Sequence, residues 1–278
     1  MQDKTSDFLQ RIKYAVASEQ LLLPSLPDVA LRIRTECDHD DVSAQKIADI
    51  ISQDPALAVR LLQVANSSLY RTRQPAENLY TAISRLGLRM VKDIILTLSL
   101  KQLYQAQNKV LQDQLRQLWQ TSVNTASLSR MLASQVPGLQ AEQAMLAGLT
   151  HNIGALPILL MAEDDEELLA NAQNLHTVIH SVQGELGAYI FKAWHFPEYL
   201  IDVVRNCYQF NRRHEGAADY LDVVQVALIE GSIYSKFDGP TDWASIPAFN
   251  KLGMDTETHM LDVEANKIMF DETEALFR

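Results

Sequence analysis

Apolar residues recur at three- and four-residue spacing along almost the whole chain, and this periodicity limits the possible folds more than any other feature. Between residues 79 and 104 the apolar positions on one helical face are Ile83, Leu86, Met90, Val91, Ile94, Ile95 and Leu98. Runs that alternate apolar and polar residues, as half-buried strands do, are scarce, and the 278 residues include only 10 glycines. The sequence therefore predicts an all-α protein.

Start and stop signals for helices divide the first part of the chain. The Leu22–Pro27 segment ends a first helical stretch, and the segment Asp28–Cys37 is predicted to resume helix. Ser43 suits the N-cap of the next helix, and Asp54 followed by Pro55 combines an N-cap with proline at the first helical position. The residues of these two helices predicted to face the core are Ile47, Ile50, Ile51, Leu57, Leu61, Val64 and Ala65.

A long, continuous helix is predicted from about Leu79 to Tyr104, because its apolar stripe is unbroken. The polar stretch 105–108 follows, and a second set of helices begins at Leu111. We place a subdomain boundary near residues 106–112.

This boundary divides the chain into an N-terminal helical part (1–106), a helical bundle (107–235) and a C-terminal helical extension (236–278), which we expect to form one continuous structural unit. The extension carries Trp243, Phe249 and Phe270, and large aromatic residues indicate docking on the rest of the protein rather than disorder.

Charge is distributed unevenly along the chain. Residues 1–110 carry 14 basic and 12 acidic side chains, whereas residues 111–278 carry 10 and 23, which accounts for the net charge of −11. Because phosphate contacts need a basic surface, the acidic second part argues against duplex DNA as a partner.

Cysteines and apolar runs indicate a cytoplasmic protein. Cys37 and Cys207 are far apart and lack a CxxC spacing, so neither a disulfide framework nor a zinc knuckle is expected. The N-terminus lacks the order of a signal peptide, and no apolar run approaches the roughly 20 residues that span a bilayer. We therefore expect no membrane insertion.

The pair His151-Asn152 is the most informative element for chemistry. A metal hydrolase would use His-Asp at such a position, and an asparagine amide is a poor ligand for a divalent cation. His176 and His180 share a helix face and a spacing that zinc can use, but two ligands are too few. The chain has no GxSxG, P-loop or GxGxxG motif.

Four linked motifs follow one another along the chain: Leu23–Pro27, Ile50–Leu57, Leu61–Ser67 and Ala82–Leu88. They resemble those of the HDOD (HD-related output domain) family of bacterial signalling proteins. The similarity continues through Leu118–Ser122, the His151-Asn152 pair, Glu185–Ala188 and Trp194–Pro197, and it covers roughly residues 20–235.

The resemblance implies a smaller N-terminal helical part packed on a bundle like that of the HD phosphohydrolases, whose active members hold one or two metal ions with histidines and aspartates. At the corresponding positions this chain has Thr121, His151, Asn152 and Gln183, with Cys207-Tyr208 in place of a later histidine pair. One histidine cannot hold a hydrolytic metal, so we expect vestigial metal-site positions, no metal, no cofactor and a structural role for His151.

Basic residues form a second candidate site. Arg85, Arg89 and Lys92 would lie on one face of the long predicted helix, with Arg71 and Arg73 in the loop before it. They are candidate contacts for a nucleotide messenger or a signalling protein. A solvated helix face and pairing with the acidic second part of the chain remain the alternatives.

Together these features predict a non-catalytic bacterial signalling module that acts through a protein or a small ligand. One alternative is a metal-dependent phosphohydrolase acting on a nucleotide or cyclic dinucleotide. The other is a catalytically silent sensor that binds a nucleotide in the vestigial pocket. The sequence leaves the ligand, the partner and the oligomeric state open.

Overall fold

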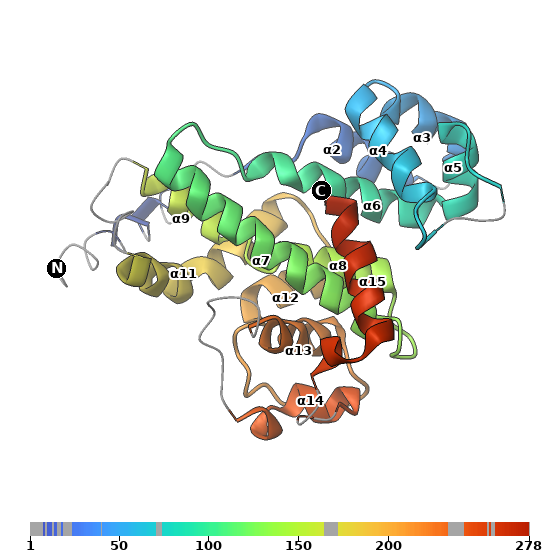
Figure 1. Ribbon diagram of the computed structural model, residues 1–278. Helices are drawn as coiled ribbons and strands as arrows, with labels where there is room; N and C mark the ends of the chain where they lie inside the picture. Colours follow the sequence, from blue (N-terminus) through green and yellow to red (C-terminus); the bar gives the residue numbers. More distant parts are fainter. Residues whose placement is uncertain are drawn as a thin grey trace.

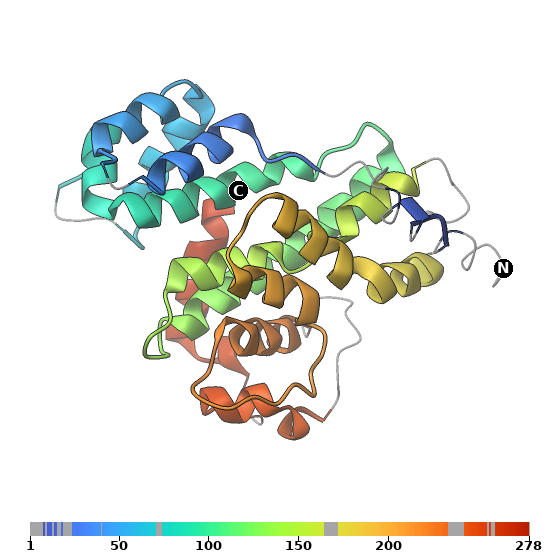
Figure 2. The same ribbon diagram turned by 180° about the vertical axis from the view of Figure 1, so that it is seen from behind.

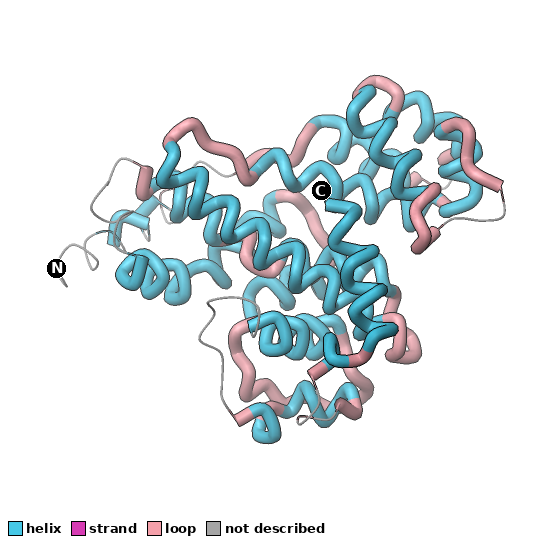
Figure 3. Tube along the Cα trace, in the orientation of Figure 1, coloured by secondary structure: helices cyan, strands magenta, loops and turns pink. Residues whose placement is uncertain are grey.

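The computed structural model describes residues 24–39, 41–70, 74–163, 172–232, 242–254, 256 and 259–277, together with positions 8, 10–12, 14, 15 and 18. These residues form helices, 3-10 turns and loops, and none of them lies in a strand (Figure 3). The all-α prediction is confirmed.

The first five labelled helices gather at one end of the molecule (Figure 1). They are α2 (Asp28–Cys37), α3 (Ala44–Ile51), α4 (Pro55–Ala65), α5 (Leu79–Leu86) and α6 (Leu88–Leu100). The predicted caps are confirmed, because Ser43 accepts a hydrogen bond from the backbone N–H of Lys46 and Asp54 accepts one from that of Leu57. The apolar stripes of α3 and α4 are buried as predicted.

The prediction of one continuous helix from Leu79 to Tyr104 is wrong. Gly87 separates α5 from α6, with φ 83° and ψ 150°, and glycine adopts such a positive φ without the steric cost that a Cβ imposes. Its N–H caps the end of α5 by donating to Ile83 O, and its carbonyl accepts from Val91 N at the start of α6. The spacing of apolar residues cannot reveal this break, because the apolar stripe of the sequence continues across Gly87.

The bundle is built around α7 (Lys109–Ala133), which packs against α8 (Ala141–Thr150), α13 (Tyr220–Ser232) and α15 (Glu264–Glu274). The other helices are α9 (Ala155–Met161), α11 (Ala172–Ala193), α12 (Glu198–Asn206) and α14 (Pro247–Leu252). Figure 2 shows the same bundle from behind, below the N-terminal helices.

A close approach of backbones fixes the turn between α8 and α9 against α11. A Cβ on Gly154 would lie 1.9 Å from Gln183 O and 2.6 Å from Gly187 N, so only glycine fits this contact. The contact holds the residues of the turn, His151 and Asn152 included, next to the middle of α11.

The C-terminal extension docks on both parts of the protein. The ring of Phe277 lies 6.0 Å from that of Trp119 on α7, and its carbonyl accepts a hydrogen bond from Lys101 Nζ at 3.0 Å. One cluster of buried apolar residues extends from Phe8 to Phe277. The domain boundaries expected from the sequence stay a prediction.

Among the described residues, the stretch Ala141–Met161 is long and apolar enough to cross a membrane, and 89% of its most apolar window is buried inside the protein. It comprises α8, the following turn and α9, which are helices of the core.

Candidate functional site

The imidazole of His151 lies in the core, at the end of α8, with 1% of the residue exposed. Its Nδ1 is 2.7 Å from the carbonyl oxygen of Gly148, and a carbonyl only accepts, so Nδ1 carries the proton. Nε2 is then a buried lone pair, and the described residues offer it no hydrogen-bond partner. Burial lowers the pKa of His151 to about 4, so the ring is neutral at physiological pH.

The carboxamide of Asn152 connects the turn to α7. Its Oδ1 lies 2.9 Å from Ser122 Oγ and accepts a hydrogen bond from Tyr104 Oη at 3.3 Å. Its Nδ2 donates to the carbonyl of Leu118 at 3.3 Å. These interactions occupy both ends of the amide, so Asn152 acts mainly as a structural link.

A pocket of about 470 Å³ opens beside this pair and is lined by residues of α7 and α11. The helix α7 presents polar side chains from successive turns: Gln114, Gln117, Thr121 and Asn124. The facing side of α11 presents His176, Ile179, His180 and Gln183, and the other described polar lining residues are Gln120, Asn152 and Tyr208. Among the residues that the structure describes, the lining includes no carboxylate and no lysine or arginine.

The structure therefore brings three of the four sequence-predicted positions to one pocket, namely Thr121, Asn152 and Gln183. His151 does not line it, and its ring centroid lies 6.0 Å from that of Tyr208, which does. The thiol of Cys207 is 3.7 Å from His151 O, and burial raises the pKa of that thiol.

A row of rings extends along the α11 side of the pocket. The ring centroids of His176 and His180 are 5.4 Å apart, and those of His180 and Tyr208 are 4.8 Å apart. Desolvation and the neighbouring His176 lower the pKa of His180. The sequence analysis did not connect this histidine pair with the vestigial metal-site positions. The spacing of His176, His180 and Gln183 nevertheless places all three on one helix face.

The residues around His151 do not fit a hydrolytic metal ion. Such an ion needs about three protein ligands and an open position for water, and among the described residues the unpartnered Nε2 of His151 forms no group of three ligands with His176 and His180. Among the described residues, the group of three that could hold a metal is His214, Asp219 and Asp222, which lies outside the pocket.

That second group is already neutralised by an arginine. Arg212 Nη2 lies 2.6 Å from Asp219 and its Nη1 lies 3.3 Å from Asp222, while His214 Nε2 is 2.8 Å from the other oxygen of Asp222. A guanidinium thus occupies the place of a cation between the carboxylates. His214 belongs to this ion-pair network.

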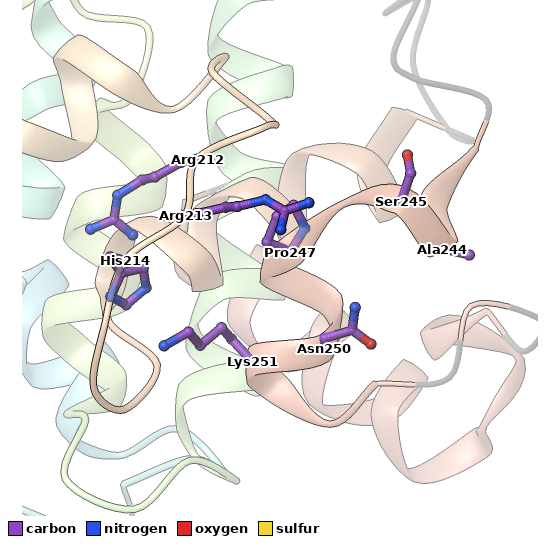
Figure 4. A pocket seen from close by; sticks show the side chains of 8 residues that line it. All are labelled: Arg212, Arg213, His214, Ala244, Ser245, Pro247, Asn250 and Lys251. Atoms are coloured by element: carbon purple, nitrogen blue, oxygen red, sulfur yellow. The ribbon is translucent and has the colours of Figure 1, made fainter.

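A cleft of about 510 Å³ adjoins the network, between the loop that carries Arg212 and the helix α14. Figure 4 shows the side chains of Arg212 and Arg213 pointing in opposite directions. The ammonium group of Lys251 donates a hydrogen bond to the carbonyl oxygen of Gly216. The basic side chains of this cleft therefore do not converge on one point.

The placement of Arg85, Arg89 and Lys92 on one continuous helix is wrong, whereas their role as partner contacts stays a prediction. Arg85 lies on α5 and donates to the carbonyl of Gln74, whereas Arg89 and Lys92 lie on α6, beyond the break at Gly87. Arg71 and Arg73 lie outside the described residues.

Comparison with known proteins places these features in a family. The family model of the HDOD domain matches residues 23–210. A solved structure from Shewanella amazonensis SB2B, described as a candidate metal-dependent phosphohydrolase, is 28% identical with a TM-score of 0.87 and covers 99% of this chain and 100% of that chain.

An HDOD domain protein of unknown function from Geobacter sulfurreducens is 20% identical with a TM-score of 0.68, and the match covers 99% of this chain and 98% of that chain. This likeness concerns the fold alone. An uncharacterised protein of Treponema pallidum (strain Nichols) is 26% identical over 239 residues, which are 81% of this chain and 44% of that protein. The chain thus spans less than half the length of that relative.

Proposed function

The chain belongs to the HDOD family, and we propose that it is a non-catalytic module of bacterial signal transduction, which acts in the cytoplasm by binding a protein or a small ligand. The observation that carries this proposal is the lining of the pocket beside His151, whose described residues present amides, hydroxyls and histidine rings and no carboxylate. Hydrolysis at an HD-type site needs a metal-bound water, and neutral amides are poor ligands for such an ion.

The occupied amide of Asn152 supports the same proposal. An aspartate in its place could act as a metal ligand. The asparagine instead uses Oδ1 and Nδ2 in hydrogen bonds with Ser122, Tyr104 and Leu118. The pair His151-Asn152 then serves to hold α7 against the turn after α8.

The rival function is a metal-dependent phosphohydrolase acting on a nucleotide or cyclic dinucleotide. One feature favours it: Nδ1 of His151 is held by a backbone carbonyl, and this arrangement leaves Nε2 as the ligand atom in many metal sites. The relative described as a candidate metal-dependent phosphohydrolase is consistent with it.

Metal content separates the two. The original chain and His151→Ala are both purified without chelator. Their contents of manganese, iron, zinc, nickel and magnesium are then measured by inductively coupled plasma mass spectrometry. We expect far less than one ion per chain in both proteins. A near-stoichiometric transition metal that His151→Ala loses would establish the rival, and hydrolysis of bis(p-nitrophenyl) phosphate with added manganese would then be measured.

A ligand-binding form of the proposal is a catalytically silent sensor. The row of rings formed by His176, His180 and Tyr208 offers stacking surfaces, and amides such as Gln117 pair with the edges of bases. Since no lysine or arginine stands among the described lining residues, we expect an uncharged heteroaromatic ligand to bind better than its phosphorylated form.

Thermal-shift titration with nucleosides and the matching nucleoside monophosphates tests the sensor. A shift with a nucleoside that Gln117→Ala abolishes and Arg116→Ala retains would support it, since Arg116 is exposed on α7 and does not line the pocket. If no nucleoside shifts the melting temperature, the regulatory module acts through a protein instead.

A further inference from the structure

A cleft of about 360 Å³ separates the N-terminal helices from the start of α12. Its basic lining residues are Arg34 on α2 and Arg89 and Lys92 on α6, and they face the segment that contains Phe196 and Tyr199. Side chains that are far apart in the sequence thus meet at one cleft, which the basic pattern of the sequence only partly anticipated.

The three basic side chains differ in their partners. Lys92 Nζ lies 3.3 Å from Asp38 Oδ1, so this charge is neutralised. The Arg34 guanidinium lies over the ring of Phe196, with Cζ 5.1 Å from the centroid, and its Nη1 is buried without a hydrogen-bond partner among the described residues. Arg89 is exposed on α6 and forms no ion pair with any described carboxylate.

Two guanidinium groups therefore have donors to offer at this cleft. A buried donor without a partner is destabilising, so an acceptor placed beside Arg34 Nη1 would recover that free energy. The guanidinium fork matches the oxygens of phosphate in a bidentate way, whereas a lysine acts as a point charge. Asp93, at the cleft and 6% exposed, is the remaining carboxylate of the lining after Asp38 pairs with Lys92.

We propose that this cleft binds a phosphorylated small molecule, whose phosphate contacts Arg34 and Arg89 and whose remainder lies against Phe196 and Leu200. The cleft is bounded by both parts of the protein, so it suits a small molecule better than a protein surface. Ligand bound there contacts α2, α6 and the start of α12 at once, and it stabilises their relative position. This inference is independent of the metal question at His151.

The experiment is isothermal titration calorimetry of the full chain with inorganic pyrophosphate, at neutral pH and low salt. We expect saturable binding of one pyrophosphate per chain. Arg89→Glu should weaken it by about tenfold or more, because a charged hydrogen-bonded contact becomes a repulsion. Arg89→Lys should retain part of the affinity.

The matched control is Arg85→Glu, which makes the same charge change on α5, where Arg85 donates to Gln74 O and does not line the cleft. We expect it to bind pyrophosphate like the original chain. Equal losses in Arg85→Glu and Arg89→Glu would mean non-specific attraction and overturn the proposal, as would a lack of saturable binding in the original chain. Circular dichroism confirms that each variant is folded.

Discussion

Asn152 Oδ1 lies 2.9 Å from Ser122 Oγ, in the middle of α7, and this pairing connects the turn after α8 to the longest of the described helices. Both residues are buried, at 1% and 0% exposed. The hydroxyl proton of Ser122 can serve either Asn152 Oδ1 or the carbonyl of Leu118, which is 3.0 Å away. The pairing thus belongs to a small network that only an amide satisfies at both ends.

The first prediction concerns the change Asn152→Asp, which restores a His-Asp pair. The carboxylate loses the donor to Leu118 O and becomes a buried charge without a cation among the lining residues. We expect the free energy of unfolding to fall by about 1–3 kcal/mol at pH 7.5, measured by urea denaturation. Asn124→Asp is the control, because Asn124 Oδ1 accepts a hydrogen bond from Gln120 and a carboxylate oxygen can accept it equally. We expect this variant to change the free energy of unfolding by no more than about 0.5 kcal/mol.

Metal content provides a second readout for the same variant. If Asn152→Asp acquires a stoichiometric metal ion that the original chain lacks, the neighbouring residues can supply the other ligands, and the missing carboxylate alone accounts for the lack of metal in the original chain.

The second prediction is an acid-dependent loss of stability through His151. Burial lowers its pKa to about 4 from 6.5, so between these values the unfolded chain binds a proton that the folded chain does not. Stability from this group is complete above pH 6.5 and is lost as the pH falls toward 4. At pH 5 the loss is about 2 kcal/mol relative to pH 7.5.

Comparison of variants isolates this contribution. The original chain and His151→Gln are unfolded in urea at pH 7.5 and pH 5, and we expect the variant to lack about 2 kcal/mol of the pH dependence. His39→Gln, at an exposed position, should retain the original dependence. An unchanged pH dependence in His151→Gln would show that the imidazole is accessible to solvent.

Local signals predicted the helices well, because caps act within one turn. Asp54 and Pro55 start α4 as expected, and α2 has the predicted bounds. The break at Gly87 was missed, since a stripe of apolar residues continues across it. The pocket was found only in part: Thr121, Asn152 and Gln183 came from the family resemblance, and nothing local in the sequence shows that α11 lies opposite α7.

The third prediction concerns Asp93, whose carboxyl group is 6% exposed. Burial raises its pKa to about 6 from 3.8, against the opposing effects of Lys92 and Arg89. The folded chain thus holds this proton more tightly than the unfolded chain, and stability from this group falls as the pH rises from 4 to 6. Asp93→Asn should raise the free energy of unfolding by about 1–3 kcal/mol at pH 7.5, and the gain should vanish near pH 4.

Asp38→Asn is the control for Asp93, because Asp38 also faces Lys92 but its side chain is 65% exposed. Exposed ion pairs contribute little, so we expect a change of less than about 1 kcal/mol at either pH. Equal effects of the two substitutions would mean that Asp93 is as hydrated as Asp38.

The fourth prediction concerns the close contact between the turn and α11. A Cβ at residue 154 would lie 1.9 Å from Gln183 O, which is backbone and cannot move aside cheaply. Gly154→Ala should therefore lower the free energy of unfolding by about 3 kcal/mol or more. It should also shift Gln183, and with it the shape of the pocket.

Gly231→Ala provides the matched comparison, because the added Cβ meets Leu128 Cδ1 at 3.4 Å and lies within α13. Alanine favours a helix interior over glycine by about 1 kcal/mol, so this variant should be equal to the original chain or slightly more stable. Both variants are unfolded in urea under the same conditions. If Gly154→Ala proves as stable as Gly231→Ala, the turn after α8 can move away from α11, and the pocket beside His151 is then adjustable rather than fixed by this contact.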